Sequence, residues 1–194
     1  MKKSSEKKKM SRNSIILIIV GIILVLWVAS SYNGLVKLDE GVNGAWGNVQ
    51  SAYQRRLDLI PNIIASVKGS AEFESEMQTK IASLRSGIGS ATTPAEIDLM
   101  GQKINTAISL VYENYPQIKS TEGFRTLEVS LEGTENRIKT ERDLYNAAVK
   151  AYNIKVRKVP SNIVAGIFNF DIKDMFKADE GAEKAPSVKE ILAE

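Results

Sequence analysis

The side chains that most often carry catalysis are missing from this 194-residue chain. It holds no cysteine and no histidine, which excludes a thiolate nucleophile, a disulfide framework, a Ser-His-Asp triad and the common zinc sites. No phosphate-binding glycine loop, HExxH helix, nucleophile elbow or EF-hand spacing occurs in the sequence. We therefore expect no enzyme activity and no cofactor.

Two groups of glutamates are the remaining candidates for metal chemistry. The glutamates of residues 72–76 are two positions apart, which distributes them around a helix, whereas those of residues 128–135 share one helical face. The Glu-x-x-His pairs that hold two metals in four-helix bundles cannot form without histidine. Calcium or magnesium on the shared face is one interpretation, and an ordinary solvated face is the one that we favour.

The net charge of +3 is concentrated in a short N-terminal segment. Residues 1–13 hold six lysines and arginines against one glutamate, a net charge of +5, so the other 181 residues carry −2. A nucleic-acid-binding protein usually carries its basic residues on the folded domain. We therefore expect no nucleic-acid partner.

Residues 14–31 (SIILIIVGIILVLWVASS) form an apolar stretch directly after this basic segment. Eighteen helical residues span about 27 Å, just enough for a hydrocarbon core of about 30 Å with Trp27 and Tyr32 at the interface. A cleaved signal peptide is the alternative, but the apolar run is at the long end for one, and we favour a single-pass anchor. The positive-inside rule then predicts a cytoplasmic N-terminus and an exoplasmic C-terminal domain.

The rest of the chain is typical of helices, because apolar residues recur every seven positions. The register of the first expected helix is Leu35, Val42 and Val49, then Arg56, and then Ile63. In the first expected helix this period continues as far as Ile88, and Thr93-Pro94-Ala95-Glu96 then starts a second helix with the residues of a capping box. Tyr115-Pro116 ends the second helix. The third expected helix ends before Pro160, and its seven-residue register is Phe124, Leu131, Ile138, Tyr145 and Tyr152.

These patterns predict an all-α protein with an N-terminal single transmembrane helix followed by an antiparallel bundle of three long helices plus a short C-terminal helix. The expected regions are residues 1–13 as a basic cytoplasmic tail, 14–31 as the anchor, 32–176 as the bundle and 177–194 as a disordered tail. The short helix covers the apolar segment Ile163–Phe176. We expect this segment to fold back and close one end of the bundle. Docking on a partner or on lipid is the alternative, and the lack of a basic face on the segment weighs against lipid.

Pro61 lies inside the first expected helix and cannot donate to the carbonyl of Leu57, so the helix should bend there. Arg55, Arg56 and Asp58 lie one turn before it, and we expect a buried ion pair that braces the bend rather than a ligand site. The four glycines of residues 34–47 indicate either a small-residue face for close helix contact or a soft joint between anchor and bundle.

A set of short strings within these expected helices forms a specific pattern. The strings are Tyr32-Asn33-x-Leu35-Val36, Ala45-Trp46-x-x-Val49, Gln54-Arg55-Arg56-x-Asp58-Leu59-Ile60-Pro61-Asn62, Val67-Lys68-Gly69, Tyr115-Pro116 with Lys119, Phe124-x-x-Leu127, Thr134-Glu135-Asn136-x-Ile138 with Arg142, Tyr145-Asn146, Tyr152-Asn153 and Pro160-Ser161-Asn162-Ile163-Val164-Ala165. Together they resemble the LemA family. The resemblance covers about residues 32–176 and departs from the family mainly at Gly69-Ser70, where an aromatic often follows the glycine, and in the extra glycines of the first helix.

The resemblance implies a bacterial single-pass protein of the plasma (inner) membrane with a helical-bundle domain and no agreed biochemical activity. It also implies frequent genetic proximity to a membrane-bound zinc metalloprotease, and a magnetosome relative that is linked to membrane shaping. Our first hypothesis is a non-enzymatic interaction or scaffold protein of the cell envelope. The alternatives are a membrane-remodelling protein that self-associates on the membrane surface and an accessory partner of such a protease. The residues expected to serve structure or interaction are Trp46, Arg55, Arg56, Asp58, Pro61, Asn62, Glu135, Asn136, Tyr145, Tyr152, Phe168 and Phe170.

Overall fold

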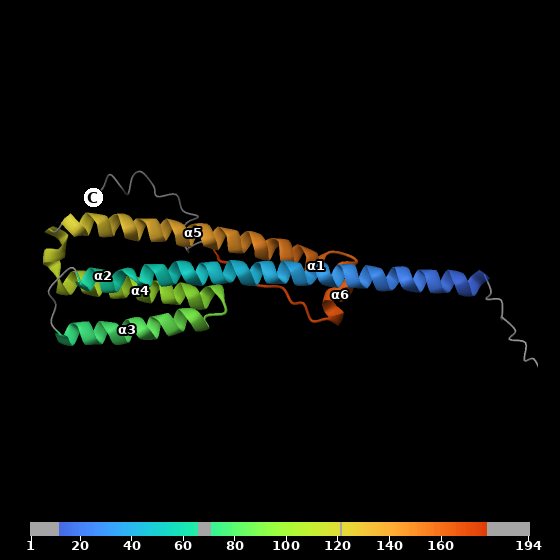
Figure 1. Cartoon of the computed structure of the whole chain (residues 1–194), viewed down its shortest axis with the longest axis horizontal. Helices are drawn as coiled ribbons and strands as arrows, with labels where there is room; N and C mark the ends of the chain where they lie inside the picture. The colour runs from blue at the N-terminus through green and yellow to red at the C-terminus, as the bar shows by residue number, and fades with distance from the viewer. Residues whose placement is uncertain (1–11, 66–70, 121, 178–194) are drawn as a thin grey trace, which may run out of the picture.

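The computed structural model describes residues 12–65, 71–120 and 122–177, and over these ranges the chain is helical and contains no strand. The elements are α1 (Arg12–Leu57), α2 (Leu59–Ala65), α3 (Ala71–Ser90), α4 (Pro94–Asn114), the 3-10 helix η1 (Pro116–Ser120), α5 (Glu122–Arg157) and α6 (Ser161–Ile167). Figure 1 shows an elongated molecule in which α5 lies along one side of α1 and the α3–α4 hairpin along the other. The predicted all-α fold with one apolar N-terminal helix and a bundle is confirmed.

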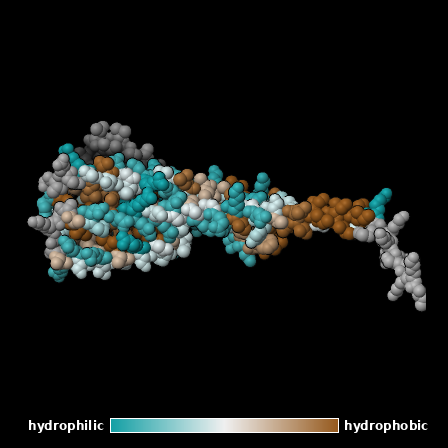
Figure 2. Space-filling view, viewed as in Figure 1, coloured by the Kyte–Doolittle hydropathy of each residue, from teal (hydrophilic) through white to brown (hydrophobic). Residues whose placement is uncertain are grey.

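The N-terminal part of α1 is the expected membrane anchor. Within the described ranges it is the one helix that is long and apolar enough to cross a membrane. Its apolar side chains are exposed, from 46% at Ile15 to 71% at Leu17, and they form the continuous brown surface in Figure 2. Exposure of so much apolar area to water is unfavourable, which makes a bilayer its natural surroundings. The expected tails at residues 1–11 and 178–194 lie outside the described residues.

α1 continues without interruption from the apolar span into the bundle, so the glycines between residues 34 and 47 do not form a break in the helix. A Cβ atom added to Gly41, Gly44 or Gly47 would meet no atom within 4 Å. The small-residue face is therefore open on the described part of the chain, and the anchor and the bundle share one helical axis.

The first bundle helix ends earlier than the sequence predicts. α1 stops at Leu57, and α2 carries Pro61 within its first turn, so the expected interruption near this proline is confirmed. The expected continuation to Ile88 is wrong, because α3 runs back antiparallel to α1. The Trp46 indole donates to the carbonyl of Ala91 (3.1 Å), whereas Arg85 pairs with Asp58 (2.6 Å). Helical periodicity is the same in both directions, so it could not reveal this reversal.

The predicted seven-residue register forms the core between the helices. Leu35, Val42 and Val49 of α1 are buried, and Ile138, Tyr145 and Tyr152 are buried on the α5 side. The start of α4 also follows the prediction: the Glu96 N–H donates to the Thr93 hydroxyl, and the Thr93 N–H donates to the Glu96 carboxylate (3.2 Å). Hydrogen bonds from the Thr92 and Thr93 N–H groups lower the pKa of Glu96.

The C-terminal apolar segment is only partly helical. α6 ends at Ile167, and residues 168–177, which we call the strap, continue without regular secondary structure. The turn into the strap places Asn169 at a φ of 57°, a left-handed conformation that asparagine tolerates better than most residues. The strap then runs back along α5 towards Asn146. The expected single helix over Ile163–Phe176 is wrong. The segment folds back onto the bundle as expected, but only α6 lies at the end of the bundle, and the strap lies along α5.

Candidate functional site

A polar cleft lies where α1, α4 and α5 meet. It has a volume of about 230 Å³ and is lined by Tyr53, Arg56, Asp98, Gly101, Gln102, Asn105, Glu135, Ile138 and Arg142. The seven-residue register of α1 places Arg56 in the seam towards α5, where Val49 occupies the previous equivalent position. Arg56 introduces a charged side chain into an otherwise apolar interface, and it lines the cleft there.

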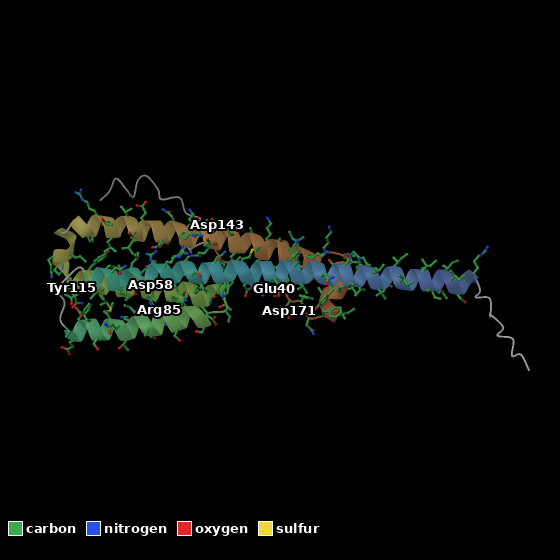
Figure 3. The ribbon with its side chains drawn as sticks, in the orientation of Figure 1. Glu40, Asp58, Arg85, Tyr115, Asp143 and Asp171 are labelled. Carbon is green, nitrogen blue, oxygen red and sulfur yellow. The ribbon has the colours of Figure 1, made fainter. Side chains whose placement is uncertain are left out.

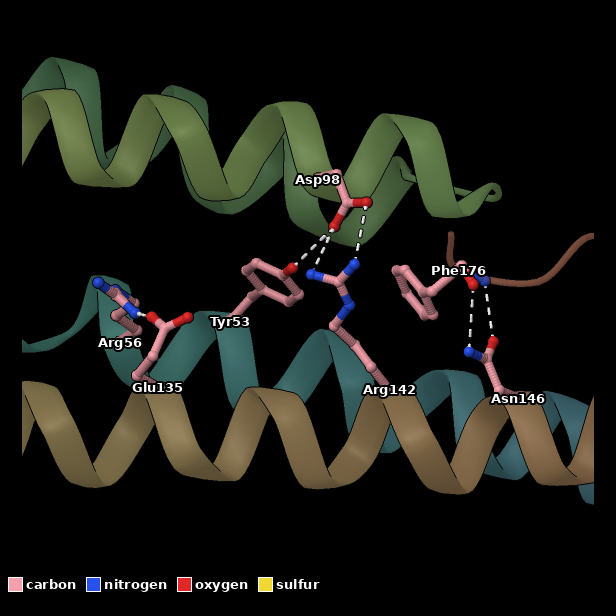
Figure 4. Close-up of polar contacts among 7 residues, drawn as sticks. All are labelled: Tyr53, Arg56, Asp98, Glu135, Arg142, Asn146 and Phe176. Atoms are coloured by element: carbon pink, nitrogen blue, oxygen red, sulfur yellow. Dashed lines mark hydrogen bonds and ion pairs between the residues drawn. The ribbon is translucent and has the colours of Figure 1, made fainter. Parts of the chain in front are cut away.

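Asp98 of α4 is the centre of the hydrogen-bond network in this cleft. The Tyr53 hydroxyl donates to Asp98 Oδ1 (3.1 Å), and Arg142 of α5 pairs with the same carboxylate (Nη1 to Oδ1, 3.3 Å). Figure 4 shows the tyrosine and the arginine converging on Asp98 from two different helices. Burial, followed by the charge of Asp98, raises the pKa of Tyr53. The phenol therefore stays protonated and acts as a hydrogen-bond donor at physiological pH.

Arg56 and Glu135 form a second connection across the cleft, from α1 to α5. The Arg56 side chain is 13% exposed and that of Glu135 is 61% exposed. Burial lowers the pKa of the Arg56 guanidinium, and its Nε atom has no hydrogen-bond partner among the described residues. The pair therefore joins a mostly buried cation to a solvated carboxylate, an arrangement that needs little desolvation of the anion.

The expected ion pair among Arg55, Arg56 and Asp58 does not form. Asp58 instead pairs with Arg85 of α3 on the surface (Figure 3), Arg56 reaches α5, and Arg55 is exposed. Both side chains of the Asp58–Arg85 pair are 54% exposed, and solvated pairs of this kind contribute about 0–1 kcal/mol. The charges near Pro61 therefore connect α1 to two other helices rather than brace the break locally.

The other candidates from the sequence separate into three places. Pro61 and Asn62 are at the end of the bundle that is distant from the apolar span, where Asn62 lines a hollow of about 180 Å³ with Leu59, Ile63, Ile118, Phe124 and Leu127. Asn136 lines an open groove on α5, beside the polar cleft. Five aromatic candidates, Trp46, Tyr145, Tyr152, Phe168 and Phe170, contact the strap or belong to it.

The strap depends on two asparagines that belong to the family strings but are not among the residues expected to serve structure or interaction. The Asn146 side chain donates to the Phe176 carbonyl (3.2 Å) and accepts from its N–H (2.8 Å). Asn153 makes the same two-way contact with the backbone of Lys173 (2.8 and 2.9 Å). The sequence does hold a signal for this pairing, because the dipeptide Tyr-Asn occurs twice, seven residues apart, on one face of α5.

The strap also contacts Arg142, one of the residues that line the polar cleft. The Phe176 ring stacks on Trp46 (centroids 6.1 Å apart) and lies under the Arg142 guanidinium (4.6 Å from the ring centroid). Lys173 forms an ion pair with Asp39 of α1 (2.6 Å). The strap therefore links α1 and α5 along the side that α3 and α4 leave open.

The cleft is arranged to hold helices together. Its two carboxylates, Asp98 and Glu135, are each paired with an arginine, and its lining contains no serine, lysine, cysteine or histidine. No group of three carboxylates suited to a metal ion occurs within the described ranges. The geometry accounts for packing between α1, α4 and α5.

Gly101 offers a test of this close packing. A Cβ atom there would lie 2.7 Å from Cε1 of the buried Tyr53 ring, which is held in place by Asp98, whereas a Cβ on Gly133 of α5 would meet no atom within 4 Å. We expect Gly101→Ala to lower the free energy of unfolding by about 1–3 kcal/mol. Gly133→Ala should raise it by up to about 1 kcal/mol through helix propensity. Urea unfolding of the full chain in mild detergent measures both, and shifts in the same direction would contradict the close contact.

Comparison with known proteins gives a consistent set of relatives. The LemA family profile matches residues 45–189. Protein LemA of Metamycoplasma hominis is 24% identical over 165 residues, which cover 83% of this chain and 75% of that protein. Magnetosome protein MamQ 2 of Paramagnetospirillum magneticum is 26% identical over 176 residues. Magnetosome protein MamQ of Magnetospirillum gryphiswaldense is 23% identical over 175 residues. Each MamQ alignment covers 75% of this chain but only 64% of the relative, so this chain spans less than two thirds of the MamQ proteins.

Proposed function

Because the chain belongs to the LemA family, we propose that it is a membrane-tethered, non-enzymatic interaction protein of the bacterial cell envelope. The continuity of α1 supports this proposal most. From Tyr32 to Leu57 the helix runs unbroken for 26 residues, a length of about 39 Å. A continuous helix holds the far end of the bundle at a set distance from the membrane, which a flexible linker would not do.

The hollow beside Asn62 is our candidate for the contact with a protein partner. It lies at the far end of the bundle, and its lining is mainly apolar. A membrane-bound protease, as the resemblance implies, is one candidate partner. In this proposal the polar cleft and the strap keep the bundle rigid while its end contacts the partner.

Copurification with site-specific crosslinking tests the proposal. We expect one membrane protein to copurify at fixed stoichiometry with the full chain from native membranes in mild detergent. A photo-crosslinking residue at Asn62 should capture that protein, whereas one at Lys103, which is exposed on α4, should not. A variant whose residues 15–26 are all leucine should keep the partner. Loss of the partner in this variant would place the interaction in the anchor, and absence of any stoichiometric protein would contradict the proposal.

Self-association on the membrane is the second candidate function, and the open face at Gly41, Gly44 and Gly47 favours it. Gly44→Leu and Gly133→Leu form a matched pair, because neither added side chain begins in contact with another atom of the described chain. If α1 mediates self-association, crosslinking in vesicles at increasing protein density should fall for Gly44→Leu and not for Gly133→Leu. Equal crosslinking in both variants would exclude this face.

Residues 1–13 are proposed to stay in the cytoplasm because of their net charge of +5. Protease added to intact spheroplasts is then expected to digest the domain that begins at Tyr32. Neutral replacements of the six basic residues should weaken or reverse the orientation. Protection of the domain until lysis would show that the opposite orientation is correct.

A further inference from the structure

α6 packs at the end of the bundle from which the apolar span emerges. Figure 1 shows it beside α1, close to the point where α1 leaves the other helices. Tyr32, which directly follows the apolar stretch, contacts Phe168 and Phe170 at the start of the strap (ring centroids 4.8 and 5.7 Å apart). The residues around α6 are therefore level with the end of the anchor.

The bundle reaches into the last turns of the apolar span itself. Trp27 and Val28 are partly buried and pack against the hydrophobic core, and Ser31 is buried although it lies within the apolar stretch. Trp27 and Tyr32 are five residues apart, a rise of about 7.5 Å along α1. Because aromatic residues at the end of a span lie at the headgroup level, α6 is placed at the boundary between the bilayer and water.

One face of α6 is apolar and uncovered. Val164 and Ala165 are buried against the bundle and form the apolar face that an amphipathic helix normally buries. On the opposite half Ile163 and Ile167 are large and apolar, Asn162 is the one exposed polar side chain, and no described segment covers these residues. Val159 before α6 and Phe168 directly after it are exposed as well. We call these four apolar residues the base patch: Val159 (74% exposed), Ile163 (58%), Ile167 (67%) and Phe168 (47%).

Basic residues flank the base patch although α6 itself has none. Lys155, Arg157 and Lys158 come from the end of α5 and the link to α6. The Cε atom of Lys155 would lie 3.5 Å from a Cβ on Gly34, which places this side chain beside α1, one turn after the span. Membrane-surface helices combine an apolar face with lysine and arginine. Here the end of α5 and the link after it supply the basic residues, and the lack of a basic face on the segment itself is therefore not evidence against lipid.

We propose that the base patch inserts into the headgroup boundary of the same membrane that α1 crosses, with Lys155, Arg157 and Lys158 contacting anionic lipid phosphates. The bundle is then seated on the membrane by α6 as well as tethered by α1. The two attachments together fix the tilt of the bundle relative to the membrane, which a single membrane-spanning helix cannot do. The inference depends on membrane anchoring and not on a protein partner, and it holds for either orientation of the chain.

A single fluorescent label reports the position of α6, because the chain has no cysteine of its own. Ile163→Cys carries an environment-sensitive dye on the base patch, and Val129→Cys carries it on an exposed apolar position of α5 (69% exposed). The labelled full-length protein is reconstituted into phosphatidylcholine vesicles with and without phosphatidylglycerol. We expect a blue-shifted emission at position 163 and quenching by lipids that are spin-labelled near the headgroup. Neither effect is expected at position 129.

The basic residues are tested in the same vesicles. Replacing Lys155, Arg157 and Lys158 with glutamine should reduce quenching at position 163 when phosphatidylglycerol is present and change it little in phosphatidylcholine alone. Added salt should have the same effect as the substitutions. Equal quenching at positions 163 and 129, with the helical content unchanged, would overturn the proposal. A label at 163 that is shielded from water but not quenched by lipid would overturn it as well, because a protein would then cover the patch.

Discussion

Tyr145→Ala is expected to lower the free energy of unfolding by about 3–5 kcal/mol, the usual cost of removing a large buried aromatic side chain. Tyr145 is 4% exposed, and its ring contacts Trp46 and Phe176 (centroids 5.2 and 5.4 Å apart). Its hydroxyl donates to the carbonyl of Asp174 in the strap (3.1 Å). The substitution therefore removes the contacts of α5 with both α1 and the strap. Urea unfolding of the full chain in mild detergent, followed by circular dichroism, measures the loss.

Two variants separate the parts of this effect. Tyr145→Phe removes only the hydroxyl and should cost about 0.5–1.5 kcal/mol, the typical net contribution of one hydrogen bond. Leu144→Ala changes the neighbouring residue, which is 55% exposed, and should cost less than about 0.5 kcal/mol. If Leu144→Ala and Tyr145→Ala shift the unfolding midpoint equally, the aromatic contact between α1, α5 and the strap does not hold this part of the bundle together.

Asn153→Ala is expected to release the strap from α5 and to cost about 1–3 kcal/mol, because two hydrogen bonds to the backbone of Lys173 are lost together. Release also frees Lys173 from Asp39 and exposes the aromatic residues beneath the strap. Amide hydrogen exchange of residues 170–177 should therefore increase more than that of α4. The same experiment on Asn146→Ala should free Phe176, which is 7% exposed in the folded chain.

Asn153→Asp distinguishes the hydrogen bonds from the shape of the side chain. Aspartate has the same size, and it can still accept from the Lys173 N–H, but it places an oxygen where the asparagine donates to the Lys173 carbonyl. We expect Asn153→Asp to destabilise the strap nearly as much as alanine does. Asn43→Ala is the control, because the Asn43 side chain accepts a hydrogen bond from the Lys173 ammonium (3.0 Å) and not from the strap backbone. Stability close to that of the unchanged chain in Asn153→Asp would show that shape, and not donation, holds the strap.

The positions of these contacts explain why the strap was missed in the sequence. The segment after Ile167 continues the run of large apolar residues with Phe168, Phe170, Ile172, Met175 and Phe176, and a helix was therefore predicted across it and α6. In the structure the asparagine side chains of α5 satisfy the strap backbone in place of helical hydrogen bonds. The partners are 20 and 30 residues apart, so no local pattern contains them.

The polar cleft shows the same division between local and distant information. The sequence register identified Arg56 as a charged residue within an apolar seam, and the resemblance singled out Glu135. Their pairing, and the convergence of Tyr53 and Arg142 on Asp98, depended on how α1, α4 and α5 are placed. Periodicity identifies the face of a helix that is buried, but it does not identify the residue that the face contacts.

The sequence by itself determined the apolar span, the helical period, the capping box at Thr93 and the interruption near Pro61, because each depends on residues within a few turns of one another. Only the tertiary structure decided that α3 reverses along α1, that the strap binds α5, and that basic residues of α5 flank the apolar face of α6. These features arise from side chains far apart in the sequence. These side chains come into contact only when the helices pack together, and for that reason no local sequence pattern predicts their contacts.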